Sequence, residues 1–171
     1  MKQGFATKFL NESAIKTRPQ IPILSFSLAE NNETKLIQRM RTVIEMHAPF
    51  SVELNGYGSF PTHTIYVHVV AKQKILQLVK TLRQLQKWMK ADKDKKPYFI
   101  VAPSITIANK LLPWQYEKAW NELKYANFSA MLMAEQLVLL KRKPGMHYNI
   151  VANFYLKANN TSVYPQPNLF Q

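Results

Sequence analysis

The chain has 171 residues, of which 47% are hydrophobic and 12% aromatic, enough for a folded core, which excludes wholesale disorder. It has no cysteine, so disulfides and thiolate metal sites are excluded, and no apolar run approaches the ~20 residues that span a bilayer. The 23 lysines and arginines outnumber the 10 aspartates and glutamates, and the net charge of +13 attracts polyanions. The candidate partners are therefore nucleic acid, nucleotides and anionic membrane surfaces, beside the alternative of an ordinary basic protein.

Hydrophobic periodicity, helix-capping residues and turn residues predict an ordered series of strands and helices. In chain order, we expect a strand over 21–28, a helix from the capping residues 31–34 to Pro49, strands over 50–54 and 63–70, a helix over 72–90, strands over 98–102 and from 104, a helix after 113, and strands over 128–133, 136–140 and 149–156. The segment 141–145 is predicted to be a hairpin turn.

This order indicates a bilobal α+β domain with two related halves, each an antiparallel sheet with helices packed outside. We expect this domain, internally duplicated, to span 21–157. Residues 1–20 are polar and basic and lack the apolar stretch of a secretory signal, so we expect an N-terminal extension and a cytoplasmic protein. The segment 158–171 is rich in Asn, Pro and Gln, which predicts an extended or disordered tail.

Two short segments share one pattern: a small hydroxyl residue, any residue, a threonine and an isoleucine. They are Thr62-His63-Thr64-Ile65 and Ser104-Ile105-Thr106-Ile107. Because side chains alternate along a strand, the two hydroxyl residues of each segment share a face. If the two strands faced one another across a cleft, their hydroxyls would line a groove suited to a phosphate or a sugar, because each hydroxyl both donates and accepts hydrogen bonds.

The paired segments resemble the two-histidine (2H) phosphoesterase superfamily, in particular the bacterial 2′-5′ RNA ligase-like and cyclic phosphodiesterase group. That family carries two His-x-Thr-aliphatic motifs, one in each lobe of a duplicated α+β fold. Its histidines act as general acid and base, and its threonines hold the phosphate. The resemblance implies that Thr62 and Ser104 stand at the two histidine positions here, and that Thr64 and Thr106 are the phosphate-holding threonines. Neither replacement can act as a general base near neutral pH.

The histidines that remain have other predicted roles. His63 lies between two threonines, so in a regular strand it points away from the groove, and only a twist would make it a displaced catalytic histidine. His68 shares the threonine face but lies ~13 Å along the strand from Thr64, too far to act on the same phosphate. His47 and His147 are interpreted as helix-end and turn residues. No histidine pair has the spacing of a metal site, so we expect no metal or other cofactor.

Hydroxyls, one aromatic ring and nearby cations are the candidate ligand contacts. They are Thr62, Thr64, Ser104, Thr106, Tyr66, Lys110 and Arg142, or its neighbour Lys143. Glycine-rich phosphate loops and Gly-x-Ser-x-Gly motifs are missing. Three interpretations stay open: a catalytically degenerate protein that binds an RNA end or a phosphate-containing nucleotide in a basic cleft, an active cyclic phosphodiesterase that uses a displaced histidine, and a structural or protein-interaction domain.

Overall fold

An antiparallel sheet of four strands, in the order β5-β3-β2-β6, is the framework of the fold. The computed structural model describes residues 2–9, 18–90 and 95–158. The strands are β2 (Phe50–Phe60), β3 (Thr64–Val69), β5 (Ser104–Ala108) and β6 (Ser129–Ala134). In β2 the register shifts at Gly56, whose φ of +69° is a left-handed conformation that favours glycine. Because of this bulge, the strand predicted to end at residue 54 continues to Phe60.

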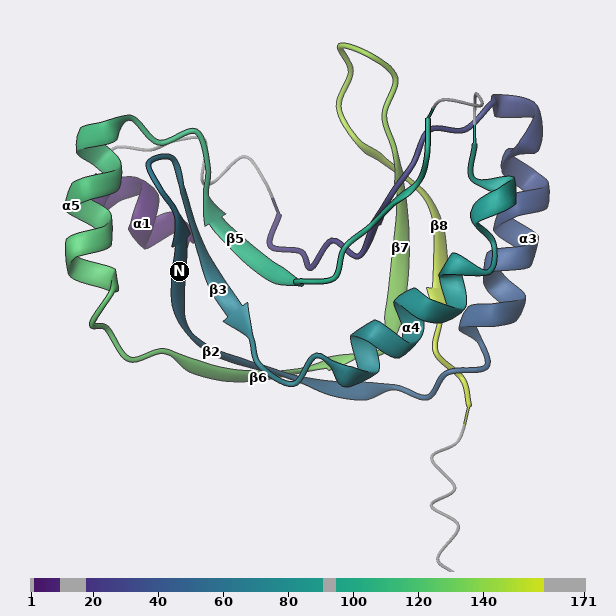
Figure 1. Cartoon of the computed structure of the whole chain (residues 1–171), viewed down its shortest axis with the longest axis horizontal. Coiled ribbons are helices and arrows are strands. Elements are labelled where there is room, and N and C mark those ends of the chain that lie inside the picture. The colour runs from purple at the N-terminus through teal and green to yellow at the C-terminus, as the bar shows by residue number, and fades with distance from the viewer. Residues whose placement is uncertain (1, 10–17, 91–94, 159–171) are drawn as a thin grey trace, which may run out of the picture.

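One face of this sheet packs against helices α1 (Lys2–Phe9) and α5 (Pro113–Leu123), which lie together at one end of the molecule (Figure 1). Ile65, Val67 and Val69 alternate along β3, point to this face and are at most 1% exposed. They form the first hydrophobic cluster with side chains of both helices and of β2 and β5. The intervening β3 residues therefore point to the opposite face.

The second lobe combines a β7–β8 hairpin with helices α3 and α4, at the other end of the molecule (Figure 1). Its elements are α3 (Glu33–Ile44), α4 (Gln73–Arg83), β7 (Gln136–Lys141) and β8 (Asn149–Tyr155). Leu36, Met40 and Ile44 recur at helical spacing along α3 and are buried in a second hydrophobic cluster with Phe154 of β8. Two clusters, antiparallel strand pairs and outer helices confirm the predicted bilobal α+β class.

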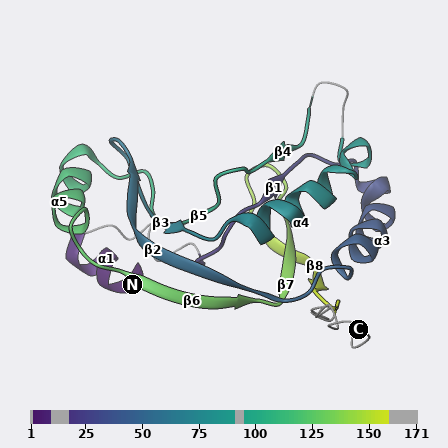
Figure 2. The ribbon, with the colours of Figure 1, turned by 60° about the horizontal axis from the view of Figure 1, so that its bottom comes forward.

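A short ribbon lies between the lobes. β1 (Leu24–Ser25) pairs antiparallel with β4 (Tyr98–Phe99), and Ile100 N donates to Ile23 O at 3.0 Å (Figure 2). Ile23 and Phe99 pack against both hydrophobic clusters. Only two residues of the strand predicted over 21–28 therefore pair regularly with another strand. The apolar side chains of the rest of that segment pack against the two clusters instead.

The N-terminal segment differs from the prediction. Phe5, Ala6 and Phe9 of α1 are buried in the first cluster, and Gln115 of α5 donates to Phe9 O at 3.3 Å. Residues 2–9 therefore pack into the first cluster, although they lie before the boundary predicted at residue 21. The helical spacing of Phe5 and Phe9 was the available signal, in a segment that is otherwise mostly polar. The predicted tail beyond residue 158 lies outside the described residues.

The long helix predicted over 72–90 is shorter than expected. α4 ends at Arg83 and is followed by a 3-10 turn, η2 (Gln86–Trp88), in which hydrogen bonds join residues three apart. This tighter winding keeps Leu85 and Met89 buried in the second cluster. Within the described ranges, no helix is long and apolar enough to cross a membrane.

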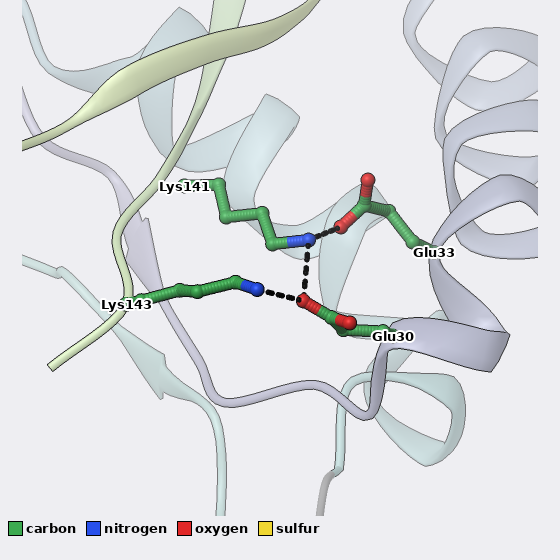
Figure 3. Close-up of polar contacts among 4 residues, drawn as sticks. All are labelled: Glu30, Glu33, Lys141 and Lys143. Atoms are coloured by element: carbon green, nitrogen blue, oxygen red, sulfur yellow. Dashed lines mark hydrogen bonds and ion pairs between the residues drawn. The ribbon is translucent and has the colours of Figure 1, made fainter.

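An ion-pair network fixes the β7–β8 hairpin to the start of α3 (Figure 3). Lys141 Nζ lies 2.6 Å from Glu33 Oε2 and 3.4 Å from Glu30 Oε1, and Lys143 Nζ lies 3.1 Å from the same Glu30 oxygen. Hydrogen bonds from Lys143 and then Lys141 lower the pKa of Glu30 below its ordinary value of 4.5. The network stabilises the connection between the hairpin and the 3-10 turn η1 (Glu30–Asn32).

This network predicts a pH-dependent contribution to stability. Because the folded pKa of Glu30 is lowered, its contribution is present above the ordinary value of 4.5 and is lost as the pH falls through the folded pKa. We expect Glu30→Gln to lower the urea midpoint at neutral pH, and parent and variant to converge in acid. Glu117→Gln changes the same charge at an exposed position without an ion pair to another described residue, and should follow the parent. A constant difference between E30Q and parent at every pH would contradict the prediction.

Candidate functional site

The two predicted motif segments lie on neighbouring strands of one sheet. β3 and β5 pair antiparallel, with Tyr66 opposite Thr106 and His68 opposite Ser104. The expectation that these strands face one another across a cleft is therefore wrong, because backbone hydrogen bonds join them edge to edge. What they share is one face of the sheet, opposite the helices of the first lobe.

The first motif segment begins in a turn. Thr62 and His63 are exposed in the β2–β3 connection, and Thr64, which is 9% exposed, opens β3 opposite Phe60. His63 Nδ1 lies 2.7 Å from Thr64 Oγ1, and His63 O accepts a hydrogen bond from Leu111 N at 3.0 Å. The predicted contact Lys110, with φ of +54°, precedes that leucine. These residues therefore cluster at one end of the sheet.

A different set of residues shares the uncovered side of the sheet. This open face is formed on β3 and β5 by Tyr66, His68, Ser104 and Thr106. Tyr66 contacts Phe60 and His68, with ring centroids 5.0 and 5.1 Å away, and its ring lies over Gly58. A Cβ at residue 58 would come within 2.5 Å of the Tyr66 ring, so glycine permits this position of the ring. The open face therefore carries the hydroxyls of Ser104 and Thr106, the imidazole of His68 and the phenol ring of Tyr66.

His68 has a neighbour on another strand that distances along β3 did not reveal. Along its own strand it lies ~13 Å from Thr64, yet strand pairing places it directly opposite Ser104, where Cβ atoms lie about 4.5–5.5 Å apart. Its exposed side chain also lines a shallow pocket of about 350 Å³ beside Lys72 and Asn55. An imidazole, a hydroxyl and a nearby cation together can hold and protonate a phosphate oxygen.

The predicted contacts in the 141–145 turn belong to the second lobe. Arg142 lies over the ring of Tyr148, with 4.7 Å between guanidinium carbon and ring centroid, and Lys143 pairs with Glu30. β7 and β8 pair with each other and not with the four-stranded sheet. The structure therefore does not bring Arg142 or Lys143 to the open face through any described contact.

Comparison with known proteins identifies the family. The family model of the 2′-5′ RNA ligase superfamily matches residues 11–145. The chain belongs to this superfamily. It is also similar to "Putative phosphoesterase ABC1741" of Shouchella clausii (strain KSM-K16), with 24% identity over 136 residues, which are 78% of this chain and 77% of that protein.

A solved structure shares the fold of this superfamily member. The crystal structure of TT0787 of Thermus thermophilus superposes with a TM-score of 0.50 and 16% identity, and the match covers 91% of this chain and 93% of that chain. The similarity extends over both lobes. It supports the predicted fold, and the family match supports the predicted 2H phosphoesterase resemblance.

A third segment of this superfamily member repeats the motif pattern and was missed from the sequence. Ser25-Phe26-Ser27-Leu28 has hydroxyl residues two apart followed by an aliphatic residue, as the 104–107 segment does. Ser25 and Ser27 are exposed, whereas Phe26 and Leu28 pack against the second cluster. The shared signal was two hydroxyl residues at alternate positions before an aliphatic residue, but serine and leucine stand here where the other two segments have threonine and isoleucine.

The described residues contain no cluster suited to a metal ion. Among residues 2–9, 18–90 and 95–158, no group of three or more His, Cys, Asp or Glu side chains could hold one.

His47 has a structural position. Its burial and the nearby charge of Lys74 lower the pKa of its imidazole, whose Nε2 lies 3.0 Å from Thr81 Oγ1. His47 therefore links α3 to α4, in agreement with its predicted helix-end role.

Proposed function

We propose that this member of the 2′-5′ RNA ligase superfamily lacks the histidine pair of its family and binds an RNA end or a phosphate-containing nucleotide on the open face. The observation that supports this most directly is the pairing of β3 with β5, which sets His68 opposite Ser104 and Tyr66 opposite Thr106. Hydroxyls and an imidazole can donate hydrogen bonds to phosphate oxygens, and a base can stack on an aromatic ring.

The chemistry of the open face favours binding over turnover. Phosphodiester hydrolysis of the family type needs a general acid and a general base acting in one step, and each transfer contributes about 10²–10⁴-fold. Within the described residues, His68 is the one imidazole on the open face. A single acid–base group leaves hydrogen bonding and positive charge as the remaining means of stabilising the phosphate, so any turnover should be weak.

The second candidate function, a weak phosphodiesterase that uses a displaced histidine, is favoured by one observation. His68 lies opposite the Ser104 position, whereas His63 contacts Thr64 at the turn end of β3. If one histidine has taken over an acid or base role, we propose that it is His68 rather than His63. The third interpretation, an interaction domain without a ligand on this face, remains the alternative against which binding is tested.

We further propose that Ser25 and Ser27 occupy the first motif of the family. The resemblance implies one motif in each lobe, but Thr64 and Thr106 lie in a single sheet. β1 lies in the ribbon between the two lobes and presents Ser25 beside Tyr98, both exposed (Figure 2). This placement agrees better than that of Thr62 and Thr64 with a first motif that lies in a different sheet from the second motif.

Binding can be tested with a 2′,3′-cyclic nucleotide and one hydroxyl. We expect Thr106→Val to weaken binding by about tenfold or more, because a hydrogen bond to a charged group contributes about 1.5–3 kcal/mol. Thr42→Val is the matched control, since Thr42 Oγ1 donates within α3 to Gln38 O at 3.2 Å, in the second lobe. Isothermal titration calorimetry at low salt measures both.

Each outcome discriminates between the three functions. Loss of affinity in T106V but not in T42V supports the open face as the binding site. Equal affinity of T106V, T42V and parent would contradict it, and no binding by the parent would favour an interaction domain. Turnover by the parent that disappears in His68→Asn, but not in His63→Asn, would instead establish the weak phosphodiesterase.

A further inference from the structure

A second pocket lies between α4, η2 and β4, with none of its lining residues on the open face. It has a volume of about 430 Å³ and is lined by Arg83, Gln86, Lys90, Lys96, Pro97 and Phe99. We propose that this basic pocket binds a phosphomonoester group, carried by a free nucleotide or by a nucleic-acid end. The proposal does not depend on the function proposed for the open face.

Positive charge in the basic pocket is not neutralised by neighbouring side chains of the described residues. Arg83, Lys90 and Lys96 line it, and none of them forms an ion pair with a carboxylate in the part of the chain that the structure describes. Lys141 and Lys143 show the opposite case, since each pairs with Glu30. Three like charges around one concavity repel one another, and a bound anion relieves this repulsion.

Arg83 is held in a position from which it can bind an anion. Its guanidinium carbon lies 4.9 Å from the ring centroid of Phe99, which β4 fixes by pairing with Leu24 of β1. Stacking on an aromatic ring leaves the planar edge of the guanidinium, with its paired N–H donors, available for phosphate oxygens. The end of α4 adds only a partial negative charge of about half a unit, less than the three cations supply.

Charge and size together favour a phosphomonoester. At neutral pH a monoester carries about −1.5 to −2 charges, which matches three cations better than the single charge of a diester. The pocket of about 430 Å³ is in the range of about 300–1,000 Å³ typical of small-ligand sites. Gln86 adds an amide donor at the rim, and the Phe99 ring adds an apolar wall.

The test compares AMP binding by two charge-matched double variants at low ionic strength, measured by calorimetry. Arg83→Gln with Lys96→Gln removes two cations of the pocket and should weaken AMP binding by about tenfold or more, because charge-assisted hydrogen bonds are the strong ones. Lys80→Gln with Lys118→Gln removes the same charge from exposed positions of α4 and α5 outside the pocket and should change affinity by less than about twofold. If both double variants bind AMP equally weakly, the loss of affinity comes from net charge alone, and the proposal is overturned.

Further arms separate the ligand sources and the two sites. Adenosine should bind at least about tenfold more weakly than AMP, and a short RNA with a 5′-phosphate should compete with AMP where the same RNA with a 5′-hydroxyl does not. If AMP binds but the phosphorylated RNA does not compete with it, the phosphomonoester ligand is a free nucleotide rather than a nucleic-acid end. T106V should retain AMP binding in the basic pocket. The AMP result therefore stands even if the open face proves not to bind a ligand. Lys90→Gln with Lys96→Gln, which spares the Arg83–Phe99 contact, repeats the test if R83Q does not fold. Adenosine binding as tightly as AMP would overturn the proposal.

Discussion

A chain that carries both Ser25→His and Ser104→His is expected to hydrolyse a 2′,3′-cyclic nucleotide at least about 100-fold faster than the parent, because a positioned proton transfer typically contributes about 10²–10⁴-fold. Either single variant should stay well below the double variant, since acid and base act in one step. Ser25 is exposed and Ser104 is half-buried at the open face, so both imidazoles fit without overpacking the core. Chromatographic detection of the nucleotide product measures the gain.

The matched control tests which segment is the first motif. Thr62→His with Ser104→His restores the pair that the sequence alone suggested, but Thr62 lies in the turn between β2 and β3. We expect this variant to show no more activity than Ser104→His alone. A gain in the Thr62 variant without one in the Ser25 variant would reverse the assignment. If neither folded variant gains activity, the open face has lost the family geometry, and the relationship concerns fold and descent alone.

Replacing Phe154 with alanine should cause the largest loss of stability among these variants. Its side chain is 0% exposed and packs in the second cluster, where β8 meets α3 and α4. Removing a buried phenylalanine typically costs about 3–5 kcal/mol, against a total stability of about 5–15 kcal/mol for a domain. The free energy of unfolding in urea measures the loss. The variant should therefore unfold at a clearly lower urea concentration than the parent.

The neighbouring residue provides the control for this stability prediction. Tyr155 follows Phe154 on the same strand, but it points to the other face and is 51% exposed. We expect Tyr155→Ala to lower the free energy of unfolding by less than about 1 kcal/mol, as surface substitutions usually do. A similar loss in both variants would show that β8 is not packed as the structure has it.

Much of the local structure was predictable from residue periodicity. Leu36, Met40 and Ile44 of α3 have helical spacing, and Ile65, Val67 and Val69 of β3 alternate. In both cases the apolar side of the element is the buried side, because burying apolar area is the main favourable term in folding. The resemblance to the superfamily was also apparent from the sequence, and the 104–107 segment on which it partly rested lies in β5.

The candidate site was less predictable because it depends on which strands pair. Distances along one strand made His68 appear remote from the motif threonines, whereas its neighbour in space is Ser104 on another strand. Nothing in the alternation of β3 specifies β5 as its partner, since any strand with one apolar face can satisfy the same pattern. Thr62 lies in the turn before β3 rather than in the strand, a position that the alternation of residues did not indicate.

The sequence by itself determined the α+β class, the positions of most helices and strands, the excess positive charge and the absence of cysteine chemistry. These properties follow from composition and from short-range periodicity, which each segment carries alone. Only the tertiary structure decided that α1 joins the core, that β3 and β5 share an open face, and that Arg83, Lys90 and Lys96 meet around one pocket. Each of these depends on contacts between residues far apart in the chain, which form because packing the whole fold buries more apolar surface than any segment can bury alone.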